Sequence, residues 1–294
     1  MNTFKIFSDS SCDLPKSLLD EYGISLIPFY ITLDQSTFLK ENEDITIEEF
    51  YNKLSDKTIY PKTSMPSVFD YINRFEPTLK EGYGILCFTL NQIFSGSYTS
   101  AINASEILLE NYPDRKIVVI DSKQATGGQG LIVYQAARMM ESGMSLEETA
   151  DKINELKKTC IVIFTVDSLD YLHRGGRIGK LTSVAGNALR VKPMIRLHDS
   201  NTDLICNVRG SKKSLNYIVE FIKNYFKENC QSYKDYDFIT GSLTREEGRV
   251  FLQEALEEEI GKPISLPKCH IGATIGTNTG PTAIGAGFIK KFDA

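Results

Sequence analysis

The sequence predicts an α/β protein, and three observations support this prediction. The chain has 294 residues, which is enough for one large or two medium domains with a substantial core. Short apolar runs alternate with amphipathic segments through the first half, as in parallel sheets whose strands are joined by helices. Near residue 166 this pattern gives way to a glycine-broken helix, a hairpin and longer helices. We therefore expect two domains, residues 1–165 and 166–294.

The N-terminal half opens with a predicted strand, helix and strand. Residues 3–7 form a short apolar run, and the run 24–33 is rich in strand-forming residues. Between them we expect a helix over residues 15–23, because it begins with proline and ends with glycine. Ser11 or Asp13 could cap this helix.

Further along, Thr46 followed by Glu49 is a capping-box pattern and predicts a helix over residues 44–56. Residues 60–67 (YPKTSMPS) are predicted as a loop because prolines and hydroxyl residues dominate them. Continuous apolar runs indicate buried parallel strands. The remaining predicted elements of this half are strands at 82–90, 115–122 and 160–166, and helices at 67–79, after 95–97, at 127–143 and at 145–159.

The C-terminal half is predicted to contain a hairpin, because two strand-like runs flank Asp199, Ser200 and Asn201. The segment 183–189 (SVAGNAL) carries small side chains that either line a ligand cavity or pack against a helix. The other elements expected here are helices at 167–181, 211–228 and 243–261, a strand at 236–242, and a strand, glycine-rich loop and strand over 268–291.

Charge, cysteine content and hydropathy argue against several classes of protein. The net charge of −5 does not suit a nucleic-acid-binding protein, although residues 173–213 carry nine basic against two acidic side chains. That stretch is either a solvated face or a surface for an acidic partner or phosphate. The six cysteines are scattered, and there is no C-x-x-C motif and no recognisable signal peptide, so we expect reduced thiols and a cytoplasmic protein. No apolar run approaches the ~20 residues of a membrane span, so no integral membrane segment is expected.

Two hydroxyl clusters are the candidate functional residues: Thr63-Ser64 with Ser67, and Ser95-Gly96-Ser97. A serine nucleophile needs a base, but the chain has only three histidines and no G-x-S-x-G motif. Metal-binding, P-loop and dinucleotide motifs are also absent, so neither a metal nor a cofactor is expected. Hydroxyls beside a helix start suit a single weak acid. The alternative is that they only cap helices and form turns.

The sequence resembles the DegV family, which includes bacterial fatty-acid-binding proteins. The resemblance rests on motifs in the family's order and spacing over nearly the whole chain. They are FSDSSCDLP, TSMPS, SGSYTSA, DSKQATGGQG, LHRGGRIG, VRG and IGTNTGP.

The resemblance implies an N-terminal parallel-sheet, Rossmann-like domain and a smaller C-terminal α/β sandwich, with a long-chain fatty acid enclosed between them. By position, Thr63 and Ser95 would bind its carboxyl group, with Ser64, Gly96 and Ser97 as neighbours. The resemblance also implies a partner kinase that phosphorylates the bound acid, so the carrier itself is not an enzyme. A palmitate-like chain is the expected ligand.

The basic stretch then has a candidate role, because Arg174, Arg177 and Arg209 could face such a kinase. One departure concerns the family pattern G-x-H-x-G-P-G, where this chain has Asn278 in place of the histidine. Asn278 can donate a hydrogen bond to the acid but cannot shuttle a proton, which puts the hand-off to a kinase in doubt. Two alternatives remain: a hydrolase that uses Ser95 or Ser97, and a carrier of a different lipid acid.

Overall fold

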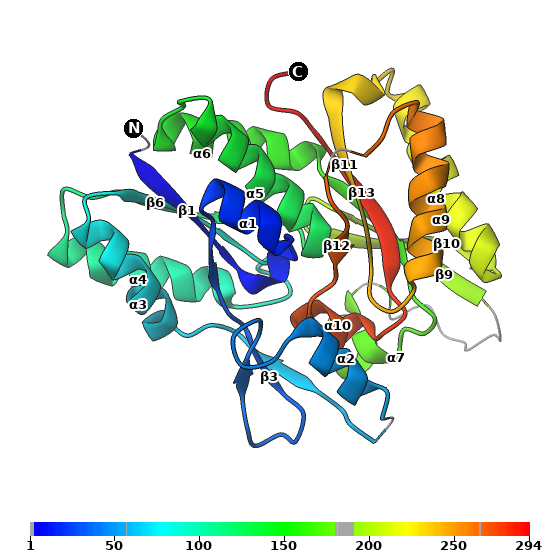
Figure 1. Cartoon of the computed structure of the whole chain (residues 1–294), viewed down its shortest axis with the longest axis horizontal. Coiled ribbons are helices and arrows are strands. Elements are labelled where there is room, and N and C mark those ends of the chain that lie inside the picture. Colours follow the sequence, from blue (N-terminus) through cyan, green and yellow to red (C-terminus); the bar gives the residue numbers. More distant parts are fainter. Residues whose placement is uncertain (1–2, 57, 180, 182–190, 265) are drawn as a thin grey trace.

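The computed structural model describes residues 3–56, 58–179, 181, 191–264 and 266–294, and these form three sheets with helices around them (Figure 1). The first sheet has four parallel strands in the order β2-β1-β6-β7, as the sequence predicts for the N-terminal half. Its strands are β1 (Phe4–Asp9), β2 (Ser25–Ile27), β6 (Gly84–Thr89) and β7 (Ile117–Asp121).

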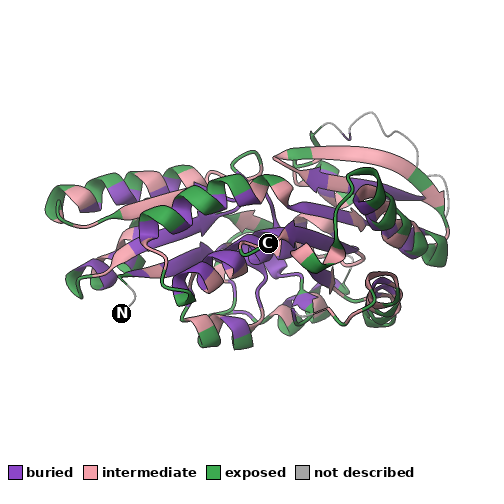
Figure 2. Ribbon diagram, turned by 90° about the horizontal axis from the view of Figure 1, so that it is seen from above, coloured by how far each residue is buried: buried purple, intermediate pink, exposed green. Residues whose placement is uncertain are grey.

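Helices cover both faces of this parallel sheet, which explains its continuous apolar runs. On β1, Phe4 and Ile6 pack against α5 and α6, whereas Phe7 packs against α3 and α4. Figure 2 shows the strands of the sheet buried beneath helices whose outer faces are exposed. The helices of this part are α1 (Lys16–Tyr22), α3 (Val68–Lys80), α4 (Ser97–Asn111), α5 (Thr126–Glu141) and α6 (Leu146–Leu156).

The second sheet has six strands in the order β10-β9-β8-β13-β11-β12, and only the β11–β12 pair is parallel. Helices α8 (Ser211–Glu228) and α9 (Glu246–Ile260) pack on one face, and α5 lies between its other face and the first sheet (Figure 1). The strands are β8 (Ile161–Thr165), β9 (Val191–His198), β10 (Asn201–Arg209), β11 (Tyr236–Ser242), β12 (Cys269–His270) and β13 (Ile284–Lys290).

A small third sheet lies beside the other two and joins β4 (Leu39–Lys40), β3 (Tyr30–Thr32) and β5 (Lys62–Ser64) in antiparallel order. Two short helices pack around it, α2 (Ile47–Leu54) and α10 (Ala273–Thr279), and α10 also contacts α7 (Asp170–Arg174). Short 3-10 turns complete the described structure at Ser10–Cys12, Lys157–Thr159 and Tyr233–Asp235.

Several local predictions are confirmed. Thr46 and Glu49 form a capping box at the start of α2. The predicted hairpin is present as β9 and β10, and its turn residues Asp199 and Ser200 take positive φ angles of 44° and 67°. Gly23 ends α1 in the left-handed conformation, at φ 62°.

Other local predictions are wrong. The run 24–33 is two strands in different sheets, because Pro28 lies between them and cannot donate a ladder hydrogen bond. The helix α1 has no side-chain cap. The backbone of Asp13 takes the left-handed conformation, and the Ser11 hydroxyl forms hydrogen bonds with the side chains of Asp9 and Gln129 instead.

Two predicted loops contain regular structure. The segment 60–67 holds strand β5, and the predicted glycine-rich loop near the C-terminus is the helix α10. Tertiary partners explain both, because β5 pairs with β3, and the Glu41 carboxylate accepts the Thr274 N–H in the first turn of α10.

The strand at 160–166 is also misassigned, because β8 pairs antiparallel with β9 and β13 in the second sheet. Apolar character predicted a buried strand but could not tell which sheet it joins.

The division into residues 1–165 and 166–294 stays a prediction, and the pairing of β8 favours a boundary before Ile161. The small-residue segment 183–189 lies outside the described residues. Among the helices that are described, none has the length and hydropathy needed to cross a bilayer.

Candidate functional site

A cavity of about 340 Å³ lies where the N-terminal sheet and the second sheet face each other. This volume is within the range of small-molecule binding sites. One wall comes from β8, β9, β11 and β13 of the second sheet. The other comes from the ends of β5 and β6 and the start of α5, and α10 closes one end.

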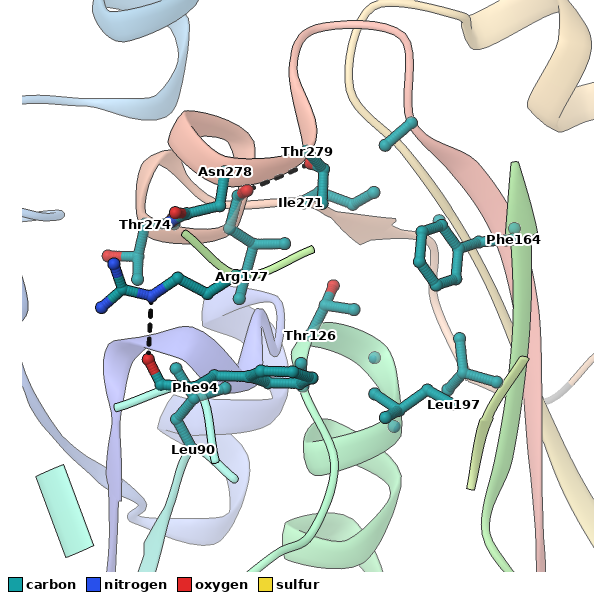
Figure 3. A pocket seen from close by; sticks show the side chains of 18 of the residues that line it. Leu90, Phe94, Thr126, Phe164, Arg177, Leu197, Ile271, Thr274, Asn278 and Thr279 are labelled. Atoms are coloured by element: carbon teal, nitrogen blue, oxygen red, sulfur yellow. Dashed lines mark hydrogen bonds between the residues drawn. The ribbon is translucent and has the colours of Figure 1, made fainter. Parts of the chain in front are cut away.

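The walls of this cavity are mainly apolar. Phe29, Leu90 and Phe94 contribute from the N-terminal side, and Phe164 and Leu197 from β8 and β9. Figure 3 shows Phe164 and Leu197 at one end of the cavity. Arg177, Thr274 and Asn278 lie at the other end, with Thr126 between the two groups. The cavity therefore has an apolar end and a polar end.

Glycines keep the second-sheet wall open. Alternate residues of β13 point to opposite faces, so Ile284 and Phe288 pack under α8 and α9 while Gly285 and Gly287 line the cavity. Gly241 of β11 lines it too, and a Cβ added there would meet Cys269 only at an ordinary 3.4 Å. The absence of side chains at these three glycines leaves room for a ligand beside Phe164 and Leu197, which line the same wall.

The two predicted hydroxyl clusters meet at this cavity. Thr63 and Ser64, on β5, line it together with Ser95 and Gly96. A Cβ added at Gly96 would lie 2.7 Å from the Met65 sulfur, so glycine allows the two segments to touch. The Ser95 hydroxyl accepts the Ser97 N–H at 3.2 Å, and no acceptor among the described residues takes its own proton, which can serve a ligand.

Ser97 does not reach the cavity, although the sequence grouped it with Ser95. Its side chain is buried, donates to the Asp9 carboxylate at 2.7 Å and lies 2.6 Å from the Tyr71 hydroxyl. The Leu90 N–H binds the same Asp9 oxygen at 2.7 Å. Asp9 therefore holds both ends of the segment that carries Ser95, and Ser97 positions this segment.

The Asp9 carboxyl lies in a fully buried, polar network. Burial raises its pKa, and hydrogen bonds from Leu90, Ser11, Gln129 and Ser97 act in the opposite direction. A buried carboxyl with this many donors is well satisfied and fixes the surrounding segments.

Arg177 lines the polar end of the cavity, where sequence analysis predicted hydroxyl groups and Asn278 but no cation. Its Nε donates to the Phe94 carbonyl at 3.1 Å and its Nη1 to the Gly175 carbonyl at 2.6 Å (Figure 3). Arg177 therefore lines the cavity, and its expected role toward a partner stays a prediction. Arg174 lies nearby on α7 and lines a neighbouring cavity, whereas Arg209, at the end of β10, lines neither.

Asn278 lies at the polar end, on α10. Its Nδ2 donates to the Thr274 carbonyl at 3.0 Å within the helix, and its Oδ1 packs against Gly175, where a Cβ would collide with it. Among the described residues no acceptor binds the second N–H of the amide, which is left to donate. Thr126, Thr274 and Thr279 also line the cavity and were not singled out from the sequence. Thr126 and Thr279 lie in the recognised DSKQATGGQG and IGTNTGP motifs, and Thr274 directly precedes the second motif.

Two buried carboxyls hold α10 in place. Glu41 accepts the Thr274 N–H at 2.9 Å and hydroxyl protons from Thr274 and Ser10. Asp13 lies close by, since a Cβ added at Gly272 would be 2.6 Å from an oxygen of each carboxyl group. Burial raises the pKa of both, and the Glu41 charge raises that of Asp13 further. Sequence reasoning missed this pair because its partners lie far away in the chain.

The raised pKa values predict an unusual dependence of stability on pH. Asp9, Asp13 and Glu41 bind protons in the folded state at pH values where the unfolded chain has released them. The free energy of unfolding should therefore fall as pH rises from about 4 through the raised pKa values. Asp13→Asn removes one such group, so its free energy of unfolding should fall less between pH 4 and 8, by about 1.4 kcal/mol for each unit of raised pKa.

Urea denaturation across this pH range measures the effect. The matched control is Asp20→Asn, which removes an exposed carboxyl on α1 and should keep the wild-type dependence. A dependence in Asp13→Asn as steep as that of the wild type would show that Asp13 releases its proton as readily in the folded protein as in the unfolded chain.

The lining gives no support to hydrolytic chemistry at Ser95. Its described residues include no histidine, and the His198 ring bonds the Lys158 carbonyl instead. Within the described parts of the chain, no three His, Cys, Asp or Glu side chains gather as metal ligands would. The arrangement suits a ligand with a long apolar part and one small acidic head.

Comparison with protein families matches residues 3–291 to a sequence model described as "Uncharacterised protein, DegV family". A DegV domain-containing protein of Clostridium perfringens is 35% identical over 283 residues, which cover 95% of each chain. Another, from Caldanaerobacter subterraneus, is 34% identical over 291 residues and covers 99% of this chain and 100% of its own.

Solved structures show the same fold. A protein of Eubacterium ventriosum described as stearic-acid-binding has a TM-score of 0.93 at 37% identity, with 99% of both chains covered. A fatty-acid-binding DegV family protein of Thermus thermophilus has a TM-score of 0.87 at 26% identity, covering 98% of this chain and 99% of its own. A DegV lipid-binding protein of Thermotoga maritima has a TM-score of 0.84 at 28% identity, with 98% of both chains covered.

Proposed function

The chain belongs to the DegV family, and on that premise we propose that it binds one long-chain fatty acid in the cavity between its two larger sheets. The observation that carries this proposal is the polarity of the cavity, which runs from apolar walls at Phe164 and Leu197 to hydroxyls and Arg177. The stearic acid named for the Eubacterium ventriosum relative suits such a cavity.

Burial of the acyl chain supplies most of the affinity in this proposal. At about 0.8 kcal/mol per buried CH₂ group, a palmitate-like chain gains on the order of 10 kcal/mol before the costs of ordering. In this proposal the acyl chain is enclosed in a tunnel and lies against the wall at Gly241, Gly285 and Gly287.

The carboxyl group would bind at the polar end. Thr63 and Ser95 are its proposed hydrogen-bonding partners, with Ser64 and the Gly96 backbone beside them and Asn278 on α10 opposite. Hydroxyls can serve a carboxyl in either protonation state because they both donate and accept. Ser97 has no direct contact in this proposal and acts by placing Ser95.

We further propose that the protein presents the bound acid to a fatty-acid kinase and is not itself the catalyst. Two exposed cations, Arg174 and Arg209, would face the acidic surface or nucleotide of this partner. Incubation of the loaded protein with a fatty-acid kinase and ATP should yield an acyl phosphate, detectable as hydroxamate after hydroxylamine treatment. Absence of acyl phosphate with an active kinase would limit the role to binding.

We propose the cytoplasm as the location of the protein, because its six cysteines are free and the cytoplasm keeps thiols reduced. Cell fractionation tests this location.

Organic extraction of the purified protein, followed by mass spectrometry, tests the binding function. We expect one equivalent of a saturated or monounsaturated acid of palmitate-like length. A different lipid acid would point to a carrier for another amphiphile. An empty extract, together with a stoichiometric adduct from a serine-directed phosphonate, would favour a hydrolase instead.

A further inference from the structure

The buried carboxyl pair Asp13 and Glu41 lies next to the polar end of the cavity. Both side chains face the start of α10, where a Cβ added at Gly272 would lie 2.6 Å from an oxygen of each. Asp13 is 8% exposed and Glu41 is 1% exposed. Thr274 lines the cavity at its polar end, and its hydroxyl donates to Glu41 at 2.7 Å (Figure 3). The pair is therefore one side chain away from the cavity.

Within the described parts of the chain, no cation neutralises this pair. The lysines of the neighbouring strands bind other groups, Lys40 the Glu43 carboxylate at 3.6 Å and Lys62 the Gln35 side chain at 3.0 Å. Two close, buried carboxyl groups without a cation do not readily ionise together, so they hold at least one proton between them. The titratable side chains that face the pair are all acids: Asp9 of β1, Cys12 beside Asp13, Tyr51 of α2 and Cys269 of β12.

Hydrogen bonds place the shared proton on Asp13. Glu41 accepts the Thr274 N–H and hydroxyl protons from Thr274 and Ser10, which stabilise its charged form. The Asp13 Oδ2 atom is buried and has no partner among the described residues. A buried oxygen without a donor favours the neutral acid. Burial and the Glu41 charge accordingly raise the pKa of Asp13 well above its usual value.

Thr126 lies between Asp13 and the cavity. A hydrogen bond from its side chain lowers the pKa of Asp13 against the larger effect of burial, and Thr126 also lines the cavity. Its backbone has a φ of 48°, a left-handed conformation that β-branched residues rarely adopt. Backbone strain of this kind is concentrated at functional sites. Each carboxyl group of the pair is thus linked to the cavity through one threonine.

A carboxylate at the polar end would bring a further negative charge close to the pair. Repulsion between charges a few ångströms apart is strong in a protein interior. Arg177 attracts an anion at every pH, because a guanidinium does not lose its proton, so only the pair varies with pH. Once Asp13 releases its proton to the solvent, the pair carries two charges and repels the anion. Reciprocally, a bound anion keeps the proton on the pair.

We propose that Asp13 and Glu41 form a proton switch for the ligand: the protein holds an ionised acid while the pair keeps its proton, and releases the acid when both carboxyl groups are charged. Affinity for the acid is then highest at low pH and falls as the pH rises. Both residues act through Thr126 and Thr274 and do not touch the ligand. This inference rests on the proposed function, because the acidic head must lie at the polar end.

The test uses 2,2-difluoropalmitate, whose fluorine atoms keep the carboxyl group ionised from about pH 5 to about pH 9, so that any pH dependence comes from the protein. Calorimetric titration of delipidated wild-type protein should show an affinity that falls about tenfold or more over this range. Palmityl alcohol carries no charge, and its affinity should stay within about twofold.

Asp13→Asn keeps the shape of the side chain but removes its charge. This variant should lose the pH dependence and, at about pH 9, should bind the difluoro acid about fivefold or more tighter than the wild type does. A damaged fold would not produce such a gain. The matched control Asp20→Asn removes an exposed carboxyl group on α1 and should keep the wild-type dependence. A dependence in Asp13→Asn as steep as that of the wild type would overturn the switch.

Proton uptake gives a second measurement that needs no variant. Titrations in buffers of different ionisation enthalpy give the number of protons bound with each ligand. In the pH range where the wild-type affinity changes, the difluoro acid should take up a measurable fraction of a proton and palmityl alcohol none. Absence of uptake with the acid at every pH would contradict the proposal.

Further outcomes separate this proposal from the proposed function. If neither palmitate nor the difluoro acid binds the wild type, the cavity does not hold an acyl chain and the proposed function fails. If both bind and the affinity for the difluoro acid does not change with pH, only the proton switch fails. If the affinity for palmityl alcohol falls in parallel with that for the acid, the pair acts by opening the cavity and not by charge, which also overturns the switch.

Discussion

Gly241→Leu is expected to lose about a hundredfold in affinity for palmitate. Gly241 lines the larger cavity from β11, and its Cβ position makes only ordinary contacts with Cys269 at 3.4–3.6 Å, so the fold should accept a side chain. The four added carbons would occupy space that about four CH₂ groups of the ligand fill. At about 0.8 kcal/mol each, the loss is about 3 kcal/mol. Titration of delipidated protein with palmitate measures it.

The controls for this variant are a smaller side chain and a shorter ligand. Gly241→Ala adds only the Cβ, so it should lose far less affinity. Acids about four carbons shorter than palmitate should lose less affinity on Gly241→Leu, because they need less of the cavity. Unchanged palmitate affinity in a folded Gly241→Leu protein would place the acyl chain elsewhere.

The double variant Thr63→Val with Ser95→Ala should lose most of the selectivity for an acidic head. Both hydroxyls line the cavity, and among the described residues the Ser95 hydroxyl has no acceptor for its proton. A hydrogen bond to a charged group contributes about 1.5–3 kcal/mol, so two of them predict a loss of about 3–6 kcal/mol, or roughly a hundredfold to ten-thousandfold, in palmitate affinity. The affinity for palmityl alcohol should change much less. Competition between the two ligands measures the ratio.

Thr202→Val is the matched control for this loss of hydroxyls. Thr202 also lines the cavity but pairs with Leu197 on the β9–β10 ladder, away from the polar end. Its removal should leave the preference for acid over alcohol unchanged. Circular dichroism should show that all variants keep the fold. Full acid selectivity in the double variant would mean that the carboxyl group binds at another place.

Sequence patterns were informative where the signal is local. Thr46 with Glu49 predicted a capped helix, and the turn residues Asp199 and Ser200 predicted a hairpin, because both signals act within a few residues of the chain. The hydroxyl motifs also identified Thr63 and Ser95, which the structure brings to one cavity. Nonlocal pairing explains the errors. The apolar run of β8 is typical of a parallel strand, yet its partners are antiparallel.

By itself, the sequence determined the α/β class, the order of most helices and strands, and the two hydroxyl clusters, because these depend on periodicity and short motifs. Only the tertiary structure decided which hydroxyls meet the cavity. The Ser97 hydroxyl donates to the Asp9 carboxylate, 88 residues away in the chain, and therefore does not line the cavity. The Glu41 carboxylate accepts the Thr274 N–H, 233 residues away, and holds α10 in place. A hydrogen bond depends on distance in space, and a local pattern carries no information on which remote side chain will complete it.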